Sequence, residues 1–303
     1  MANRIRTDER RSGVTLTELM VALAITIIVA AQAMYAYSMQ FEKSGEQERI
    51  VESQGEVRLA SRVLLSDLRM AGFMVDTTAG LGSNDGGTSG SDVICTSDPE
   101  VIDPAVVDTA SKRLSGASLT SAVGAGNTTL SFVTSTMDID SDGDVDFTAG
   151  GGVLISGGDE THCARVVSVS GSGLVFDPPA PAGFTVAASE AIVVPAIVYD
   201  VTGTQLSRNG TVLSNQIEDI QIEYGIDVDG NGLIEGAEFP IDSLTGQDLS
   251  RIRTARIHVT GRASRPVPGF AGQFAAVANR TASAADEFMR RRTSADATLR
   301  NLR

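Results

Sequence analysis

Oxygen-bearing side chains in residues 227–238 recur at the spacing of a calcium-binding loop. The run DVDGNGLIEGAE matches the pattern D-x-[DN]-x-[DN]-G-x5-E at every defined position. The positions that would supply oxygens are Asp227, Asp229, Asn231, the carbonyl of Leu233, Glu235 through a water, and Glu238 with both carboxylate oxygens. Gly232 would allow the sharp turn that brings them together. We therefore expect a calcium ion here, and the simpler alternative is a solvated turn rich in Asp and Gly.

A second acidic run places aspartate at every other position around the turn glycine Gly143. Its members are Asp138, Asp140, Asp142, Asp144 and Asp146. Ala149 stands where a calcium loop would have its closing glutamate. This run is therefore either a calcium loop of low affinity or an acidic turn.

Few side chains could do acid–base or nucleophilic chemistry near pH 7. The two histidines, His162 and His258, are isolated in the sequence, and there are only two cysteines. These numbers exclude a zinc site built from a Cys/His cluster. The sequence has no G-x-S-x-G, H-E-x-x-H or glycine-rich phosphate-binding motif. We therefore expect a protein that is not an enzyme.

The charge is unevenly distributed along the chain, whose formal net charge is −14. Residues 1–73 carry nine basic and nine acidic groups, residues 74–250 carry four and 26, and residues 251–303 carry eleven and three. A nucleic-acid partner is disfavoured, because phosphate binding needs clustered Lys and Arg on a basic domain. We expect the C-terminal arginines to face carboxylates of the same fold or of a neighbouring subunit, and the alternative is a separate acidic partner.

Residues 14–37 are almost wholly apolar and carry a single charge, Glu18. As a helix this segment could span a bilayer of about 30 Å. One interpretation is a secretory signal peptide with a basic start and an Ala31-Gln32-Ala33 cleavage site. A second is an ordinary membrane anchor with Glu18 near the interface.

A third interpretation uses the junction RRSGVTLTEL at residues 10–19, which resembles the class III leader of type IV pilins and type II secretion pseudopilins. In that family a short basic leader ends in Gly and the apolar helix follows at once. The resemblance implies that a prepilin peptidase cuts after Gly13 on the cytoplasmic side and that Val14 becomes the methylated N-terminus. Val14 departs from the family, which usually has Phe at this position.

Glu18 falls at the fifth position of the implied mature chain. A carboxylate inside an apolar membrane helix costs several kcal/mol unless it has a partner. The resemblance implies that Glu18 pairs with the N-terminal amine of the adjacent subunit and so sets the axial stagger of a filament.

The helical pattern continues beyond the apolar segment. An apolar stripe at i, i+3, i+7, i+11 and i+14 comprises Val57, Ala60, Leu64, Leu68 and Ala71. Gly45 and Gly55 predict a bend or soft spot, and Gly72 predicts the end of the helix. The run RVLLSDLRMAGF at residues 62–73 resembles the helix end of PilW-type minor pilins. Residues 297–302 resemble the terminal strand of that group and of J-type pseudopilins.

From residue 74 the sequence changes to short apolar runs separated by Gly, Ser, Asn and Asp. The predicted strands are 129–134, 152–156, 164–169, 174–177, 191–200, 216–225 and 252–260, with a hairpin at Asn209-Gly210. Residues 77–92 read as a flexible loop. We expect an α+β, pilin-like fold with three parts: a leader at 1–13, a long helix at 14–73 that spans the membrane over 14–37, and an antiparallel β-rich domain at 74–303.

Cys95 and Cys163 lie 68 residues apart. The leader implies that everything after the membrane helix is exported into an oxidising compartment, where a disulfide is favoured over two free thiols. We therefore expect these two cysteines to be bonded.

The resemblance implies a single-pass inner-membrane protein with its globular part in the periplasm, which then joins a pilus or pseudopilus. The expected partners are the prepilin peptidase and other minor and major pilins, contacted through the N-terminal helix. We expect a minor pilin that acts in pilus initiation or in a tip complex. The alternatives are a J-type pseudopilin of type II secretion and a calcium-dependent adhesin at a filament tip.

Overall fold

The computed structural model describes residues 14–103, 114, 116–133 and 137–302, apart from the side chains of Glu42 and Glu46. The expected leader with Gly13, and the last residue of the strand expected at 129–134, lie outside these residues. The chain divides into two compact units, Met1–Arg49 and Ile50–Arg303. The first unit holds the N-terminal half of helix α1, and the second holds its C-terminal half and all the described strands.

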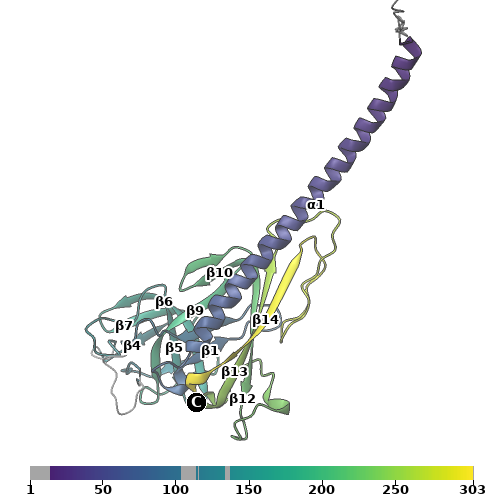
Figure 1. Cartoon of the computed structure of the whole chain (residues 1–303). Helices are drawn as coiled ribbons and strands as arrows, with labels where there is room; N and C mark the ends of the chain where they lie inside the picture. Colours follow the sequence, from purple (N-terminus) through teal and green to yellow (C-terminus); the bar gives the residue numbers. More distant parts are fainter. Residues whose placement is uncertain (1–13, 104–113, 115, 134–136, 303) are drawn as a thin grey trace, which may run out of the picture. The chain divides into compact units, whose positions relative to one another are not determined.

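Helix α1, Leu16–Met70, is unbroken and continues through both Gly45 and Gly55 (Figure 1). Its apolar part is long and hydrophobic enough to cross a membrane, and the side chains of that part are exposed in the described chain. This agrees with the expected membrane-spanning segment, because an all-round apolar helix without protein around it needs lipid as its solvent.

The C-terminal half of α1 is amphipathic and packs within the second unit. All five residues of the predicted apolar stripe are buried, at most 2% exposed. They share one core with strand residues that include Tyr199, Ile220 and Ile257. The helix ends at Met70, and Gly72 follows with φ +78°, a left-handed conformation that favours glycine. The predicted end of the helix is thus confirmed.

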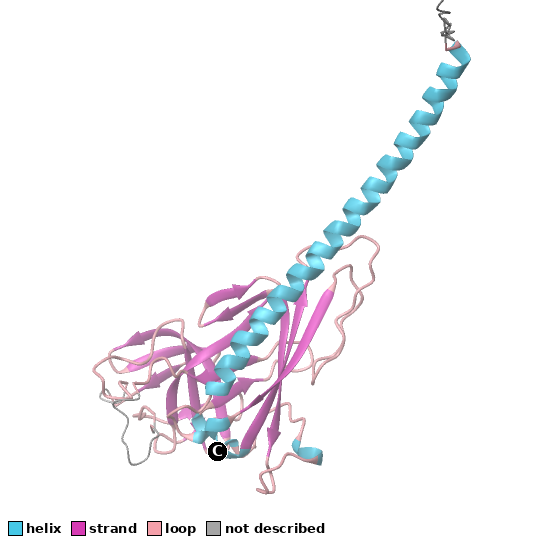
Figure 2. Cartoon of the chain, viewed as in Figure 1, coloured by secondary structure: helices cyan, strands magenta, loops and turns pink. Residues whose placement is uncertain are grey.

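Antiparallel sheets, the loops that connect them and a few short 3₁₀ helices make up the rest of the described second unit (Figure 2). The largest has nine strands in the order β1-β2-β9-β5-β6-β7-β4, with the hairpin β10-β11 attached to β9. Its strands are β1 Leu81–Asn84, β2 Val93–Ser97, β4 Thr129–Ser131, β5 Gly152–Gly157, β6 Glu160–Ser170, β7 Gly173–Asp177, β9 Ile192–Thr202, β10 Gln205–Arg208 and β11 Thr211–Ser214. Strands β3 Val123–Gly124 and β8 Thr185–Val186 form a separate pair.

A three-stranded sheet, β12-β13-β14, carries most of the core that contacts α1. Its strands are β12 Ile217–Ile226, β13 Ile252–Arg262 and β14 Arg290–Thr298, all antiparallel. One face presents Ile220, Ile222, Ile257 and Val259 to the core, as the two-residue period of a strand requires. The α+β class and the antiparallel architecture agree with the prediction.

The predicted strands from 152 onward all form, within a few residues of their expected bounds. The Asn209-Gly210 hairpin is also confirmed: Asn209 has φ +50° and Gly210 has φ +75°, as a type I′ turn requires.

Two expectations were wrong. Residues 77–92 are not simply a flexible loop, because they contain the short 3₁₀ helix Thr77–Ala79 and strand β1. Leu81 and Ala79 are buried, and β1 pairs with β2. Partners far along the chain impose this order on a sequence whose Gly, Ser and Asp content favours turns locally.

The terminal strand was also misplaced. Strand β14 covers Arg290–Thr298, and residues 300–302 form a 3₁₀ helix in place of the strand expected at 297–302. Leu299 and Leu302 are both fully buried, and their i, i+3 spacing suits a helical turn better than a two-residue alternation.

Candidate functional site

The acidic loop at 227–238 follows β12 directly and ends in a 3₁₀ helix, Gly236–Glu238. Its base is fixed on both sides. Tyr224 and Ile241 exchange two backbone hydrogen bonds, of 2.8 and 3.0 Å, and the Asp227 N–H donates to the Arg251 carbonyl at 3.0 Å. The flanks are thus a strand and an extended segment, as expected for an isolated loop, in contrast to the two helices of an EF-hand.

Three carboxylates of this loop converge. Asp227, Asp229 and Glu238 each offer an oxygen within 4.8 Å of the others. The Gly232 N–H donates to Asp227 Oδ2 at 3.1 Å, and Gly232 itself has φ +82°. The sharp turn that the sequence predicted at Gly232 is therefore present.

Backbone N–H groups of the loop fix the position of the Glu238 carboxylate by hydrogen bonds. Its Oε1 accepts from Val228 N at 2.8 Å, and its Oε2 accepts from Glu235 N at 3.0 Å. These backbone hydrogen bonds, chiefly the one from Glu235, lower the pKa of Glu238 below its ordinary value. The remaining predicted ligands stand on the loop's exposed part, where Asn231 Oδ1 accepts from Leu233 N at 2.7 Å.

Asp227 differs from the other acidic residues of the loop because it is buried, at 2% exposure. Its Oδ1 is buried and has no hydrogen-bond partner among the described residues. The nearest cation to the other oxygen is Arg253, whose Nε lies 3.6 Å from Oδ2. A buried carboxylate oxygen without a partner is costly, so this atom calls for a ligand.

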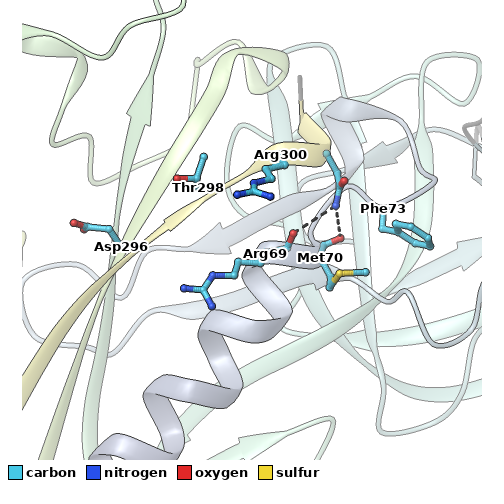
Figure 3. Close-up of a pocket in the computed structure, with 7 residues that line it drawn as sticks. Arg69, Met70, Phe73, Asp296, Thr298 and Arg300 are labelled. Carbon is cyan, nitrogen blue, oxygen red and sulfur yellow. Dashed lines mark hydrogen bonds between the residues drawn. The ribbon is translucent and has the colours of Figure 1, made fainter.

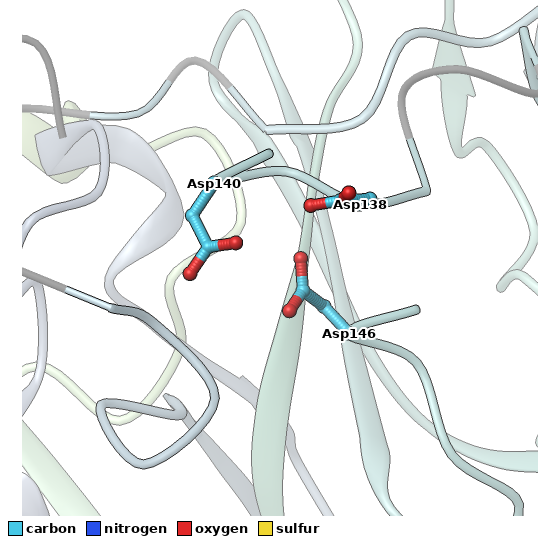
Figure 4. A group of neighbouring side chains, drawn as sticks. All are labelled: Asp138, Asp140 and Asp146. Carbon is cyan, nitrogen blue, oxygen red and sulfur yellow. The ribbon is translucent and has the colours of Figure 1, made fainter. Parts of the chain in front are cut away.

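The second acidic run also brings carboxylates together, at Asp138, Asp140 and Asp146 (Figure 4). Asp140 and Asp146 are buried, and burial raises the pKa of Asp146 to about 7. All four carboxylate oxygens of Asp138 and Asp140 accept backbone N–H groups, including Asp103 N on Asp140 Oδ2 at 2.5 Å. Backbone N–H groups of the run and of Asp103 thus hold these two side chains, and Asp142 and Asp144 are exposed on a neighbouring acidic hollow.

Glu18 stands in the first turn of α1, one turn after Thr15. Its Oε2 accepts from the Thr15 N–H at 2.9 Å and from the Thr15 hydroxyl at 3.0 Å. The Thr15 hydroxyl oxygen in turn accepts from Glu18 N at 3.3 Å. This reciprocal pair is a capping box, which satisfies N–H groups at the helix start.

Comparison with protein families agrees with the reading of this N-terminal segment. Residues 9–31 match a family model described as the prokaryotic N-terminal methylation motif. The match covers Gly13, Val14 and Glu18. A comparison with curated proteins found no match. The N-terminal segment is a prepilin-type leader joined to an apolar helix.

The disulfide expected on the exported side forms between Cys95 in β2 and Cys163 in β6, with their Cα atoms 5.6 Å apart. Both cysteines are fully buried, next to Leu154 and Val198. The bond closes a loop of 68 residues and joins two strands that are not adjacent in the sheet.

A surface hollow of about 700 Å³ lies at the C-terminal end of α1 (Figure 3). Its lining comprises Arg69, Met70, Phe73, Asp296, Thr298, Arg300 and Asn301. The Asn301 amide donates to the Arg69 and Met70 carbonyls at 3.4 Å, which caps the helix end. Among the lining residues of the hollow, Asp296 is the only carboxylate, and it pairs with Arg256 at 2.7 Å. The hollow therefore does not assemble an acid–base pair.

His258 is not isolated in the fold, although it is in the sequence. Its Nδ1 lies 2.7 Å from Ser294 Oγ and its Nε2 lies 3.1 Å from Glu223 Oε2, so it links β12, β13 and β14. In Ser-His-Asp hydrolases Nε2 faces the serine, which is the opposite arrangement. Glu223, His258 and Ser294 therefore form a polar contact across three strands. Sequence spacing could not reveal it, because Glu223 and Ser294 lie 35 and 36 residues from His258.

Several C-terminal arginines face carboxylates of the same unit, as expected, whereas Arg292 donates to the Ala275 and Ala276 carbonyls. Arg290 pairs with Glu218 and Asp286 at 2.6 Å each, and Arg280 pairs with the fully buried Asp219. Arg280 also stacks on Phe274, at 4.4 Å from the ring centre. These ion pairs hold the long connection at residues 263–289, and the start of β14, against β12.

Proposed function

We propose that this protein is a filament subunit of the type IV pilin class: a minor pilin that acts in pilus initiation or in a tip complex. The observation that carries the proposal is the methylation motif at residues 9–31, which overlaps the start of a helix able to span a membrane. Processing after Gly13 would leave Val14 as the mature N-terminus and Glu18 as its fifth residue.

Two features of the second unit support the minor-pilin assignment. The C-terminal half of α1 packs on an antiparallel sheet, which is the architecture expected from the leader. The run 62–73, which resembles the helix end of PilW-type minor pilins, coincides with the real end of the helix at Met70. The globular unit would lie in the periplasm before assembly and on the filament afterwards.

The helix start suggests how Glu18 takes part in assembly. Both hydrogen bonds from Thr15 to the Glu18 carboxylate go to Oε2, and Oε1 accepts no hydrogen bond from the described residues. An N-terminal amine of an adjacent subunit would find Oε1 free without disrupting the capping box. The pairing of a charged amine with a carboxylate in lipid offsets the cost of each charge alone.

The test is the incorporation of Glu18→Ala into filaments in the native host. We expect the variant to be cleaved and stable in the membrane but depleted from purified filaments at least tenfold, because the intersubunit ion pair is lost. Thr26→Ala is the matched control: Thr26 is a polar residue of the same apolar segment whose hydroxyl only bonds the Ala22 carbonyl. Glu18→Ala present in filaments at the wild-type level would contradict the proposed role.

A further inference from the structure

We propose that the loop Asp227–Glu238 binds one calcium ion, held by Asp227, Asp229 and Glu238 with oxygens from Asn231 and Leu233. This site goes beyond the filament-subunit function and does not depend on it. The sequence pattern suggested the site, and three structural observations now support it: convergence, a buried oxygen without a partner, and a base that is already closed.

Convergence concentrates negative charge in this loop, as it also does in the second acidic run. Carboxylates repel one another, so on a solvated turn they would spread into water. Here three of them approach within 4.8 Å. The Arg251 guanidinium is not available to them, because it donates to the Val228 carbonyl at 2.5 Å and pairs with Asp248 at 2.9 Å. Arg253 reaches Asp227 only at 3.6 Å, so the loop keeps excess negative charge for a cation.

Asp227 supplies the observation that points to a bound ligand. The side chain is 2% exposed, and its Oδ1 is buried without a hydrogen-bond partner among the described residues. Its other oxygen is fixed by the Gly232 N–H at 3.1 Å. A metal ion is the ligand that would satisfy Oδ1, because the N–H donors of the loop bond other oxygens and two further carboxylates converge with Asp227.

The second acidic run lacks this feature. Both oxygens of Asp138 and of Asp140 accept backbone N–H groups, Asp146 Oδ2 accepts from Ile139 N at 2.6 Å, and none of these three side chains has a buried oxygen without a partner among the described residues. It therefore serves as an internal comparison for the proposal.

The donor set selects calcium over magnesium. Calcium accepts six to eight oxygens in flexible geometry, whereas magnesium requires a near-ideal octahedron and keeps several waters. The loop offers three carboxylates, an amide oxygen and a carbonyl within twelve residues. The Tyr224–Ile241 backbone pair already closes the base of the loop, so binding has little chain entropy to overcome.

The experiment is calorimetric titration of the detergent-solubilised full chain, stripped with a chelator, with calcium chloride up to 5 mM. The variants are Glu238→Gln and Asp229→Asn, whose side chains lie on the loop surface, so the apo fold should be kept. Asp159→Asn is the matched control, because it removes one carboxylate from the exposed turn between β5 and β6.

We expect each loop variant to bind one calcium ion fewer than the wild type, or to bind it at least tenfold more weakly, while Asp159→Asn binds normally. Calcium should also raise the thermal unfolding midpoint of the wild type by several degrees relative to chelator, and magnesium at the same concentration should not. If the wild type binds no calcium, if Glu238→Gln binds as the wild type does, or if magnesium competes equally, the proposed site is overturned.

Discussion

At the residue scale, long-range polar contacts fix α1 to the large sheet. Asp67 Oδ2 accepts from Tyr199 Oη at 2.5 Å and from Arg208 Nε at 2.8 Å. Tyr199 is fully buried, and the Asp67 and Arg208 side chains are 16% and 23% exposed. Loss of Asp67 would leave the Tyr199 phenol without its hydrogen-bond acceptor and the Arg208 guanidinium with only the exposed Glu100, at 3.5 Å.

We therefore expect Asp67→Ala to lower the free energy of unfolding by about 2–4 kcal/mol, because breaking a largely buried charge pair costs more than the pair contributes. Denaturant unfolding of the detergent-solubilised chain measures this difference. Glu52→Ala, an exposed carboxylate of the same helix, is the control and should change the free energy by less than about 0.5 kcal/mol. Equal effects of the two variants would refute the account of Asp67.

Asp92 gives the protein a pH dependence of known sign. The side chain is 3% exposed, and burial raises the pKa of Asp92 to about 7 in the folded state. In the unfolded chain an aspartic acid releases its proton near pH 4. The contribution of Asp92 to the free energy of unfolding is therefore complete below pH 4 and is lost as the pH rises to about 7. Its two oxygens accept from Gly86 N and Ile222 N, both at 2.9 Å, which limits the rise.

We predict that the free energy of unfolding of wild type, minus that of Asp92→Asn, falls between pH 4 and pH 7 by up to about 4 kcal/mol. The subtraction removes groups common to both proteins, such as His162, whose pKa burial lowers. Denaturant midpoints measured at four or five pH values across this window provide the comparison. A difference that stays flat, or rises with pH, is incompatible with a buried, protonated Asp92.

Sequence reasoning at this scale succeeded where the relevant residues lie close together in the chain. The calcium-loop pattern, the Asn209-Gly210 hairpin and the Gly72 helix end depend on neighbours within about a dozen residues. The two partners of Asp67, and Ile222 as one of the two partners of Asp92, lie 130 to 141 residues away, and no local pattern encodes that proximity.

At the element scale, the end of α1 is set by two glycines and the last turn of the chain. Gly72 has φ +78°, and a methyl group there would collide with the Leu302 side chain and approach the Asn301 carbonyl at 3.2 Å. Gly80 packs against the same leucine. The C-terminal 3₁₀ helix therefore closes over the end of α1, which explains why Leu302 is fully buried.

Two glycine substitutions in this helix region should have opposite effects. Gly72→Ala should lower the free energy of unfolding by about 1–3 kcal/mol, because alanine is strained at positive φ and meets Leu302. Gly55→Ala should raise it by about 0.5–1 kcal/mol, because Gly55 is helical with nothing within 4 Å of an added methyl. The denaturant midpoints of the two variants test this. A stabilising Gly72→Ala would show that the glycine is not needed to end the helix.

Strand positions followed from apolar alternation wherever a strand has one buried face, as in β13. Apolar alternation did not predict β1, β2 or the short pair β3 and β8, and β14 was misplaced. Strand β1 is set by its pairing with β2, and β14 is an edge strand whose side chains are mostly exposed. Composition alone could not distinguish an ordered Gly-rich strand from a loop.

At the scale of the whole molecule, the second unit carries the whole excess of acidic groups, and its C-terminal arginines pair with part of that acidity. Arginines from β13, β14 and their connection pair with carboxylates of β12 and of the following loop. Much of the acidity that remains belongs to loops, and at 227–238 we attribute it to a cation. The N-terminal unit adds a leader and a helix suited to a membrane.

The central claim is that the leader is removed after Gly13 to release a filament subunit. Intact-mass and N-terminal peptide measurements on the protein extracted from its native membrane test this most directly. The account predicts a chain that begins at Val14 and carries one added methyl group. A chain that begins at Met34, after the Ala31-Gln32-Ala33 site, or one that keeps residues 1–13, would contradict it.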